Sequence, residues 1–157
     1  MKNFKKIALF STLMALVLSC SKDDGGGSAT INFEVIGVWD LTEVNISSAQ
    51  DVNMDGTSST NLVDEVDCIS GTLLIDADLT WTFEQTGLFI TPITNGEYNA
   101  QCSGTITASG TWLADATEIR FQGSSTLSSF RIVGQTLVNT IDEDLPGVKS
   151  FVYELRQ

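Results

Sequence analysis

Apolar side chains recur at every second position through most of this 157-residue chain. Trp81 and Phe83 are separated by a threonine, and Phe151, Tyr153 and Leu155 keep the same spacing near the end of the chain. A period of two places alternate side chains on opposite faces of a strand, whereas a helix has a period of 3.6. The pattern therefore predicts an all-β protein whose strands each bury one face.

Nine strands are expected, and short turn signals separate most of them. Short connections favour antiparallel neighbours. A set of eight or nine strands curls or splits rather than staying flat, and closure into a barrel removes the exposed edges. We expect an antiparallel up-and-down barrel of eight to nine strands, although a β-sandwich fits the alternation equally well. The predicted strands are 34–46, 69–77, 79–87, 97–106, 108–114, 117–123, 127–133, 136–142 and 148–156.

Residues 47–67 break the alternation with a polar stretch that we expect to form a long loop. Asp51, Asn53, Asp55 and Thr57 occupy alternate positions around Gly56. This spacing matches the first half of an EF-hand calcium loop, in which a tight turn directs alternate oxygen ligands inward. The alternative is a plain loop in which Asp and Asn favour turns. A structural calcium ion is thus a possible ligand of these four residues.

The second half of the calcium pattern is incomplete. Leu62 occupies the twelfth position, where an EF-hand has a bidentate glutamate. Asp64, Glu65 and Asp67 follow closely and offer substitute carboxylates. A single helical turn capped by Thr60 is also expected here.

The first 19 residues have the organisation of an export signal. Three lysines precede the apolar run from Ile7 to Leu18, and Cys20 follows a small residue. An apolar run of this length is too short to span a bilayer as a helix. The arrangement resembles a bacterial lipobox, which implies cleavage after residue 19 and fatty acylation of Cys20, with palmitate among the acyl chains. Residues 20–33 would then form a flexible tether and residues 34–157 the folded domain.

The four residues from Ser21 to Asp24 place a lysine before two aspartates, directly after the cysteine. They resemble the surface-export signal of Bacteroidetes lipoproteins. This resemblance implies an outer-membrane protein, anchored by lipid and exposed on the cell surface.

The composition excludes several functional classes. The chain has 20 acidic and eight basic side chains, and removal of residues 1–19 leaves a net charge of −15. Such a charge argues against nucleic acids as partners. The chain has no histidine, so it lacks the usual general base, the usual zinc ligand and any Ser-His or Cys-His pair. We do not expect an enzyme.

Two cysteines, Cys68 and Cys102, remain besides Cys20. In an exported protein such a pair indicates a disulfide. Two free thiols or a metal-binding pair are the alternative.

Several short motifs together resemble the lipocalin-like domains of small Bacteroidetes lipoproteins. They are Gly37-Val38-Trp39, the cysteine pair, a second Gly-x-Trp at residues 110–112, and Arg156 after the last aromatic strand. The resemblance covers roughly residues 34–157. It implies structural roles for Gly37, Trp39 and Arg156, with the arginine packed across the tryptophan ring in a cation–π contact.

The function implied by this resemblance is binding rather than catalysis. A barrel of eight strands is just wide enough to hold one small ligand or to be filled by its own side chains. We therefore expect a small apolar or amphipathic ligand in the barrel. The alternative is a surface module with a solid barrel, whose acidic loop contacts a protein or a glycan. The candidate pocket residues are Trp81, Phe83, Trp112, Phe121 and Tyr153.

Overall fold

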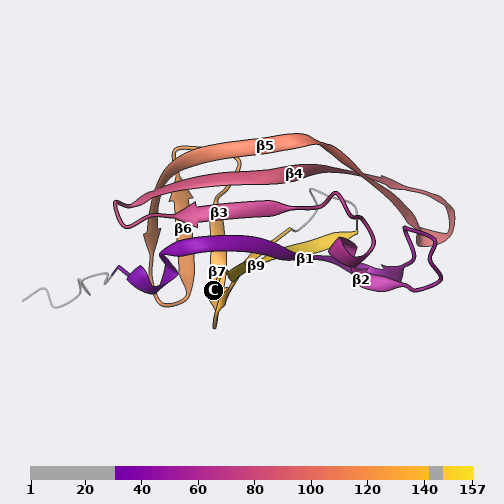
Figure 1. Cartoon of the computed structure of the whole chain (residues 1–157), viewed down its shortest axis with the longest axis horizontal. Helices are drawn as coiled ribbons and strands as arrows, with labels where there is room; N and C mark the ends of the chain where they lie inside the picture. The colour runs from indigo at the N-terminus through magenta and orange to yellow at the C-terminus, as the bar shows by residue number, and fades with distance from the viewer. Residues whose placement is uncertain (1–30, 142–146) are drawn as a thin grey trace, which may run out of the picture.

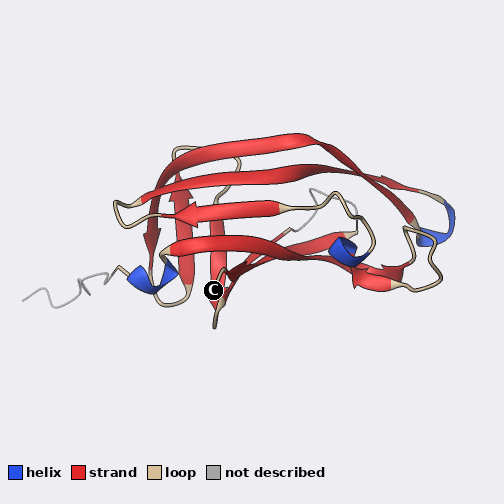
Figure 2. Cartoon of the chain, in the orientation of Figure 1, coloured by secondary structure: helices blue, strands red, loops and turns tan. Residues whose placement is uncertain are grey.

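A computed structural model describes residues 31–141 and 147–157. The predicted export signal, Cys20 and most of the tether lie outside these residues. Within them no helix is long and apolar enough to cross a membrane. The strands, drawn in red in Figure 2, are β1 (Gly37–Gln50), β2 (Ser59–Asn61), β3 (Gly71–Ile75), β4 (Thr80–Pro92), β5 (Tyr98–Ala114), β6 (Glu118–Gln122), β7 (Ser129–Val133), β8 (Thr136–Thr140) and β9 (Val148–Leu155). Three single-turn 3-10 helices complete the fold: η1 (Phe33–Val35), η2 (Leu62–Asp64) and η3 (Thr94–Gly96).

All nine strands belong to one sheet in which every neighbouring pair is antiparallel. From β3 to β9 each strand pairs with the next one in sequence, and β1 pairs with both β3 and β9. The contact between β1 and β9 runs from Trp39 opposite Leu155 to Ile46 opposite Val148 and closes the barrel. The closed barrel of eight strands confirms the expected architecture, and the β-sandwich alternative is wrong. The ninth strand, β2, is an extra edge strand on β1.

The strands differ greatly in length, and this gives the molecule its elongated shape. Strands β1, β3, β4 and β5 run side by side along the long axis, while β6 and β7 cross behind them (Figure 1). The prediction of separate strands at 97–106 and 108–114 is wrong, because Thr107 pairs with Glu84 and continues the same ladder. Strand β5 is therefore a single strand of 17 residues.

The polar stretch 47–67 is more ordered than expected. Strand β1 continues to Gln50, and β2 lies within the predicted loop. The expected helical turn is present as η2, but its cap is Asn61 rather than Thr60, because the Asn61 side chain accepts a hydrogen bond from the Val63 amide. The turn before β4 also differs from the prediction. Leu79 has φ 67°, which is outside the extended region, so β4 begins at Thr80 rather than at residue 79.

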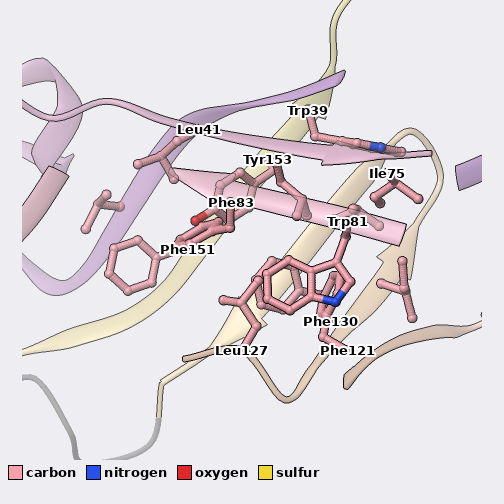
Figure 3. Close-up of a cluster of buried hydrophobic side chains, with 14 of the residues drawn as sticks. Trp39, Leu41, Ile75, Trp81, Phe83, Phe121, Leu127, Phe130, Phe151 and Tyr153 are labelled. Carbon is pink, nitrogen blue, oxygen red and sulfur yellow. The ribbon is translucent and has the colours of Figure 1, made fainter. Parts of the chain in front are cut away.

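The core of the barrel is filled by aromatic rings, as Figure 3 shows. Phe121 packs edge-on against both Trp81 and Phe130, with ring centroids 5.2 and 5.0 Å apart. Phe130 also stacks on Tyr153 at 5.5 Å, and Phe83 packs edge-on against Tyr153. Offset and edge-to-face pairs add to the free energy that burial of these rings contributes. The part of the barrel interior that these rings occupy is therefore filled by side chains.

The 3-10 helix η1 covers one end of the barrel, at the left of Figure 1. Val35 is buried, and its carbonyl accepts a hydrogen bond of 2.8 Å from the indole N–H of Trp39. Phe33 packs edge-on against Trp112, and the Asn32 amide donates to the Ala114 carbonyl. We call this covered end the closed end.

Beyond the opposite end, the chain forms a second, smaller lobe that we call the distal lobe (residues 47–70 and 86–104). It contains β2, η2 and the tip of the β4–β5 hairpin. Leu62, Ile69 and Ile90 are buried there and belong to the same hydrophobic cluster as the barrel core. The Cys68–Cys102 disulfide joins the loop before β3 to β5 and confirms the predicted pairing.

Gly110 marks the point where β6 crosses β5. A Cβ atom at this position would lie 1.7 Å from the Gln122 carbonyl oxygen. The close approach lets the Trp81 indole N–H reach the carbonyls of Thr111 (3.0 Å) and Gln122 (3.3 Å). The Gly-x-Trp pattern at residues 110–112 thus has a physical reason, since any side chain at 110 would push the two strands apart.

Replacement of this glycine tests the crossing. We expect Gly110→Ala to lower the free energy of unfolding by about 3 kcal/mol, because the added methyl group must displace backbone. Ser109→Ala, at the exposed neighbouring position, should change it by less than about 0.5 kcal/mol. Chemical denaturation followed by tryptophan fluorescence measures both. Equal stability of the two variants would contradict the close approach.

Candidate functional site

The barrel interior opens at the end that faces the distal lobe. A hollow of about 190 Å³ lies there, between β4, β5, β8, β9 and the chain before β7. We call it the mouth hollow. Its inner wall consists of buried side chains, and Leu88 lies at its rim. The wall residues are Phe83, Gln85, Leu127, Phe151 and Tyr153.

A buried polar pair lies in this apolar wall. The Tyr153 hydroxyl donates a hydrogen bond to the Gln85 side-chain carbonyl, and the two residues are 1% and 8% exposed. Burial raises the pKa of Tyr153 far above its ordinary value, because the phenolate would lose its hydration. Tyr153 is therefore a neutral hydrogen-bond donor throughout the physiological pH range.

The rim of the hollow is less buried than its wall. Ile106 is 41% exposed, and Ile141 and Asn139 are half-buried. Thr126 completes the rim from the loop before β7. The hollow thus combines an apolar wall, a few polar groups and an opening, which are the usual properties of a small-molecule site.

The structure divides the five predicted pocket residues into two groups. Phe83 and Tyr153 line the mouth hollow. Trp81, Trp112 and Phe121 are at most 5% exposed and belong to the packed core. Their polar atoms are already used, since the Trp112 indole donates to the Asp76 carbonyl at 2.9 Å. These three residues have no surface left for a ligand.

The size of the hollow restricts what it can hold. Sites for drug-sized ligands usually have volumes of about 300–1,000 Å³, whereas a cavity of about 150 Å³ accommodates benzene. A hollow of about 190 Å³ therefore fits a compact ring or a short branched chain. The small apolar or amphipathic ligand expected from the sequence would therefore have to be of this size.

The acidic loop of residues 51–57 is held together by its own hydrogen bonds. The Asp51 carboxylate accepts from the amides of Asp55 (3.0 Å) and Gly56 (2.9 Å). The Asn53 side chain also accepts from the Asp55 amide, and Asp55 accepts from the Thr57 amide. This is the geometry of successive turns in which short polar side chains bond to nearby backbone.

Glu65 is the carboxylate that the fold brings against this loop. It is 5% exposed, and one of its oxygens accepts a hydrogen bond from the Val52 amide at 2.9 Å. No group of three or more acidic or cysteine side chains is gathered as a metal site in residues 31–141 and 147–157. Calcium binding by Asp51, Asn53, Asp55 and Thr57 stays a prediction of the sequence.

Arg156 lies on the outer surface of the barrel and binds Asp40. Its Nε donates to the Asp40 carboxylate at 2.8 Å, and this hydrogen bond lowers the pKa of Asp40. The sequence instead suggested a cation–π contact with Trp39, whose ring is buried inside the barrel. Trp39 and Asp40 are consecutive residues of β1, so their side chains point to opposite faces of the sheet. Arg156 binds Asp40 on the outer face and is therefore separated from the Trp39 ring. Gly37 has φ 150°, a backbone conformation that other residues rarely adopt, and an added Cβ would lie 2.6 Å from the Leu155 side chain.

Further depressions lie outside the barrel, and two of them are larger than the others. A groove of about 490 Å³ in the distal lobe separates the acidic loop from the β4–β5 hairpin tip. Met54 and Ile93 on its walls are 89% and 51% exposed, and Asp51 and Glu97 lie beside them. We call it the distal groove. The other depression is wide and shallow, covers the outer face of β1, β3, β4 and β5, and is lined mainly by threonine, serine and aliphatic side chains.

Sequence reasoning missed Gln85 and Leu88. Gln85 follows Trp81 and Phe83 in the same two-residue phase, so a polar residue at an inward position was the signal that could have found it. Leu88 gave no such signal, because a β-bulge between Thr86 and Leu88 shifts the alternation there.

Comparisons with family models, with curated proteins and with solved structures gave no match for this chain. The site is therefore interpreted from its own chemistry.

The buried polar pair has a measurable effect on stability at alkaline pH. In the unfolded chain Tyr153 ionises near its ordinary pKa of 10.0, whereas the folded protein keeps it protonated. The stability that this difference contributes is fully present below pH 10 and is lost as the pH rises further, by up to about 1.4 kcal/mol per pH unit. Tyr153→Phe should remove this part of the pH dependence in denaturation experiments at pH 9 to 11.

The same variant should be less stable at pH 7 by about 1–3 kcal/mol, because Gln85 loses its partner. The double variant Gln85→Leu with Tyr153→Phe should recover much of this loss. Identical alkaline slopes for the parent protein and Tyr153→Phe would contradict the buried hydroxyl.

Proposed function

We propose that this protein is a lipid-anchored binding protein of the cell envelope, with a lipocalin-like barrel that holds a small ligand at its mouth. One observation carries the proposal: Phe83, Gln85 and Tyr153 line an open hollow at the end of an otherwise filled barrel. Mouths of β-barrels are recurrent positions for small-molecule sites. The step from barrel to binding protein is an analogy between folds, which the site chemistry then restricts.

The chemistry of the hollow indicates a compact, uncharged ligand. Its wall is mainly apolar, and the Gln85 amide and the Asn139 side chain supply neutral polar groups. The net charge of the chain disfavours anions near its surface. An aromatic or branched ring with a single hydroxyl or carbonyl group has the required size and polarity.

The membrane anchor of this proposal comes from the sequence. The lysines before the apolar run and Cys20 after it support export and acylation. Several acyl chains would hold the protein firmly, since each buried methylene contributes about 0.8 kcal/mol. The lysine and two aspartates after Cys20 support the outer membrane and the cell surface as its location.

A surface interaction module is the second candidate, and the distal groove favours it. Met54 and Ile93 are both exposed and line the same groove, and apolar side chains that cluster in a surface depression often mark an interaction site. The acidic loop forms one wall of this groove. This position agrees with the alternative in which the acidic loop contacts a protein or a glycan. In that case the filled barrel serves only as a scaffold for contacts with a protein or a glycan.

Titration with phenol tests the mouth hollow. We expect phenol at millimolar concentration to shift the amide NMR signals of Gln85, Leu88 and Tyr153 in the purified protein. Leu88→Trp should abolish these shifts, because the larger ring occupies the hollow. Val133→Trp is the matched control, since it adds the same ring at a position that is 48% exposed at the end of β7.

Shifts confined to Met54, Ile93 and their neighbours would instead assign binding to the distal groove. A lack of any shift at the hollow in the parent protein, or shifts that persist in Leu88→Trp, would contradict the proposed site.

Substitution of Cys20 tests the anchor. We expect the parent protein in the outer-membrane fraction and Cys20→Ser in the soluble fraction, because the variant lacks the thiol that is acylated. Fractionation followed by immunoblotting measures this, and Cys102→Ser controls for the loss of a cysteine as such. Membrane association of Cys20→Ser would contradict the lipid anchor.

A further inference from the structure

One edge of β5 has no partner strand over most of its length. On its other side β5 pairs with β4 from Thr80 opposite Thr111 to Pro92 opposite Tyr98. Its pairing with β6 covers only Thr111–Ala114. Within the part of the chain that the structure describes, no strand borders residues 98–110 on this side. The free edge is the upper border of the sheet in Figure 1.

The direction of the unpaired backbone groups follows from the ladder. The Trp112 amide donates to the Leu79 carbonyl, so even-numbered residues of β5 direct their backbone groups toward β4. Backbone groups alternate along an antiparallel strand, and the register with β4 is continuous from Thr105 to Thr111. Thr105, Thr107 and Ser109 therefore direct their N–H and C=O groups to the free side. We call residues 105–109 the edge segment.

The edge segment lacks most features that protect sheet edges. Natural edges are usually short or carry lysine, proline or a bulge. Strand β5 has 17 residues and contains no charged residue and no proline. Gly104, with φ 65°, bends the strand next to the bulge opposite Thr86 and Leu88, but the five residues after it are regular. An edge of this kind is a template for the addition of another strand.

We propose that the edge segment pairs with the edge segment of a second copy of this chain, in antiparallel orientation about Thr107. In this register Thr107 pairs with Thr107 of the second copy, and Thr105 pairs with Ser109 of the second copy. Because these three residues all direct backbone groups away from β4, a two-fold axis at Thr107 would satisfy both edges at once, with about six hydrogen bonds. Gly123 approaches the same edge beside Ser109 and Gly110 and limits the paired segment at that end.

The side chains agree with this register on both faces of the joined sheet. On the outer face, hydroxyl residues meet hydroxyl residues, a favourable cross-strand combination. On the inner face, Ile106 would lie opposite Ala108 of the second copy. Ile106 is 41% exposed in the single chain, so pairing would remove apolar surface from water.

Charge also favours self-pairing at this place. Two copies of a chain with a net charge of −12 repel each other over most approaches. The uncharged strand β5 presents no acidic side chain at the contact, and its neighbour Glu84 lies one strand away on β4. The charged surface thus restricts where two copies can meet and leaves this edge available.

Cysteine substitution at the axis tests the contact in the full chain within its own membrane. Thr107→Cys would bring two thiols together across the two-fold axis, at a separation that suits a disulfide. We expect mild oxidation to convert most of this variant to a covalent dimer on a non-reducing gel. Thr82→Cys is the matched control, because it is an exposed threonine on the outer face of the neighbouring, fully paired strand β4, and it should remain monomeric.

Sedimentation velocity of the detergent-solubilised full chain gives an independent measurement. We expect twice the monomer mass for the parent protein and a single monomer mass for Thr107→Pro. Proline removes an N–H that points to the free edge, so the pairing with β4 is kept. A monomeric parent protein, or equal crosslinking of Thr107→Cys and Thr82→Cys, would overturn the proposal. Phenol binding at the mouth hollow is measured separately, by the NMR shifts of Gln85, Leu88 and Tyr153, although Ile106 belongs both to the rim of the hollow and to the edge segment.

Discussion

The pairing of the first long strand with the last is the constraint on which the other features depend. Strand β1 bonds to β3 on one side and to β9 on the other, and this contact converts a meander into a barrel. Closure satisfies the backbone groups of both terminal strands, which a flat sheet would leave as edges. It also brings Tyr153 of β9 within hydrogen-bonding distance of Gln85 on β4. The mouth hollow therefore exists only because the barrel is closed.

The unequal lengths of the strands explain why one molecule combines a filled barrel, a hollow and a free edge. Strands β6, β7 and β8 have five residues each, whereas β4 and β5 have 13 and 17. The short strands complete the barrel only at its closed end, where aromatic rings fill the interior. The long strands continue past them, so the interior opens and β5 loses its neighbour. The mouth hollow and the free edge of β5 are thus two consequences of the same mismatch in strand length.

The sequence predicted the fold class, the barrel and the disulfide, because alternation and cysteine spacing are local or compositional signals. It predicted the site only in part. Trp81 and Phe83 have the same phase and the same chemistry, and only the crossing of β6 at Gly110 decides which ring is packed and which faces the hollow. The partner of Arg156 was missed for a similar reason, since only the pairing of β1 with β9 places Asp40 beside it. Such features depend on contacts between distant residues, which no single segment encodes.

Amide hydrogen exchange along the contact between β1 and β9 tests the closed barrel most directly. Asp40 and Glu154 are partners there, and the Arg156 amide donates to the Val38 carbonyl at 2.7 Å. A closed barrel predicts that the amides of Asp40 and Glu154 exchange as slowly as the central amides of β3 and β4. Exchange of both at the rate of an unprotected peptide, while β3 and β4 remain protected, would show an open sheet and contradict this account.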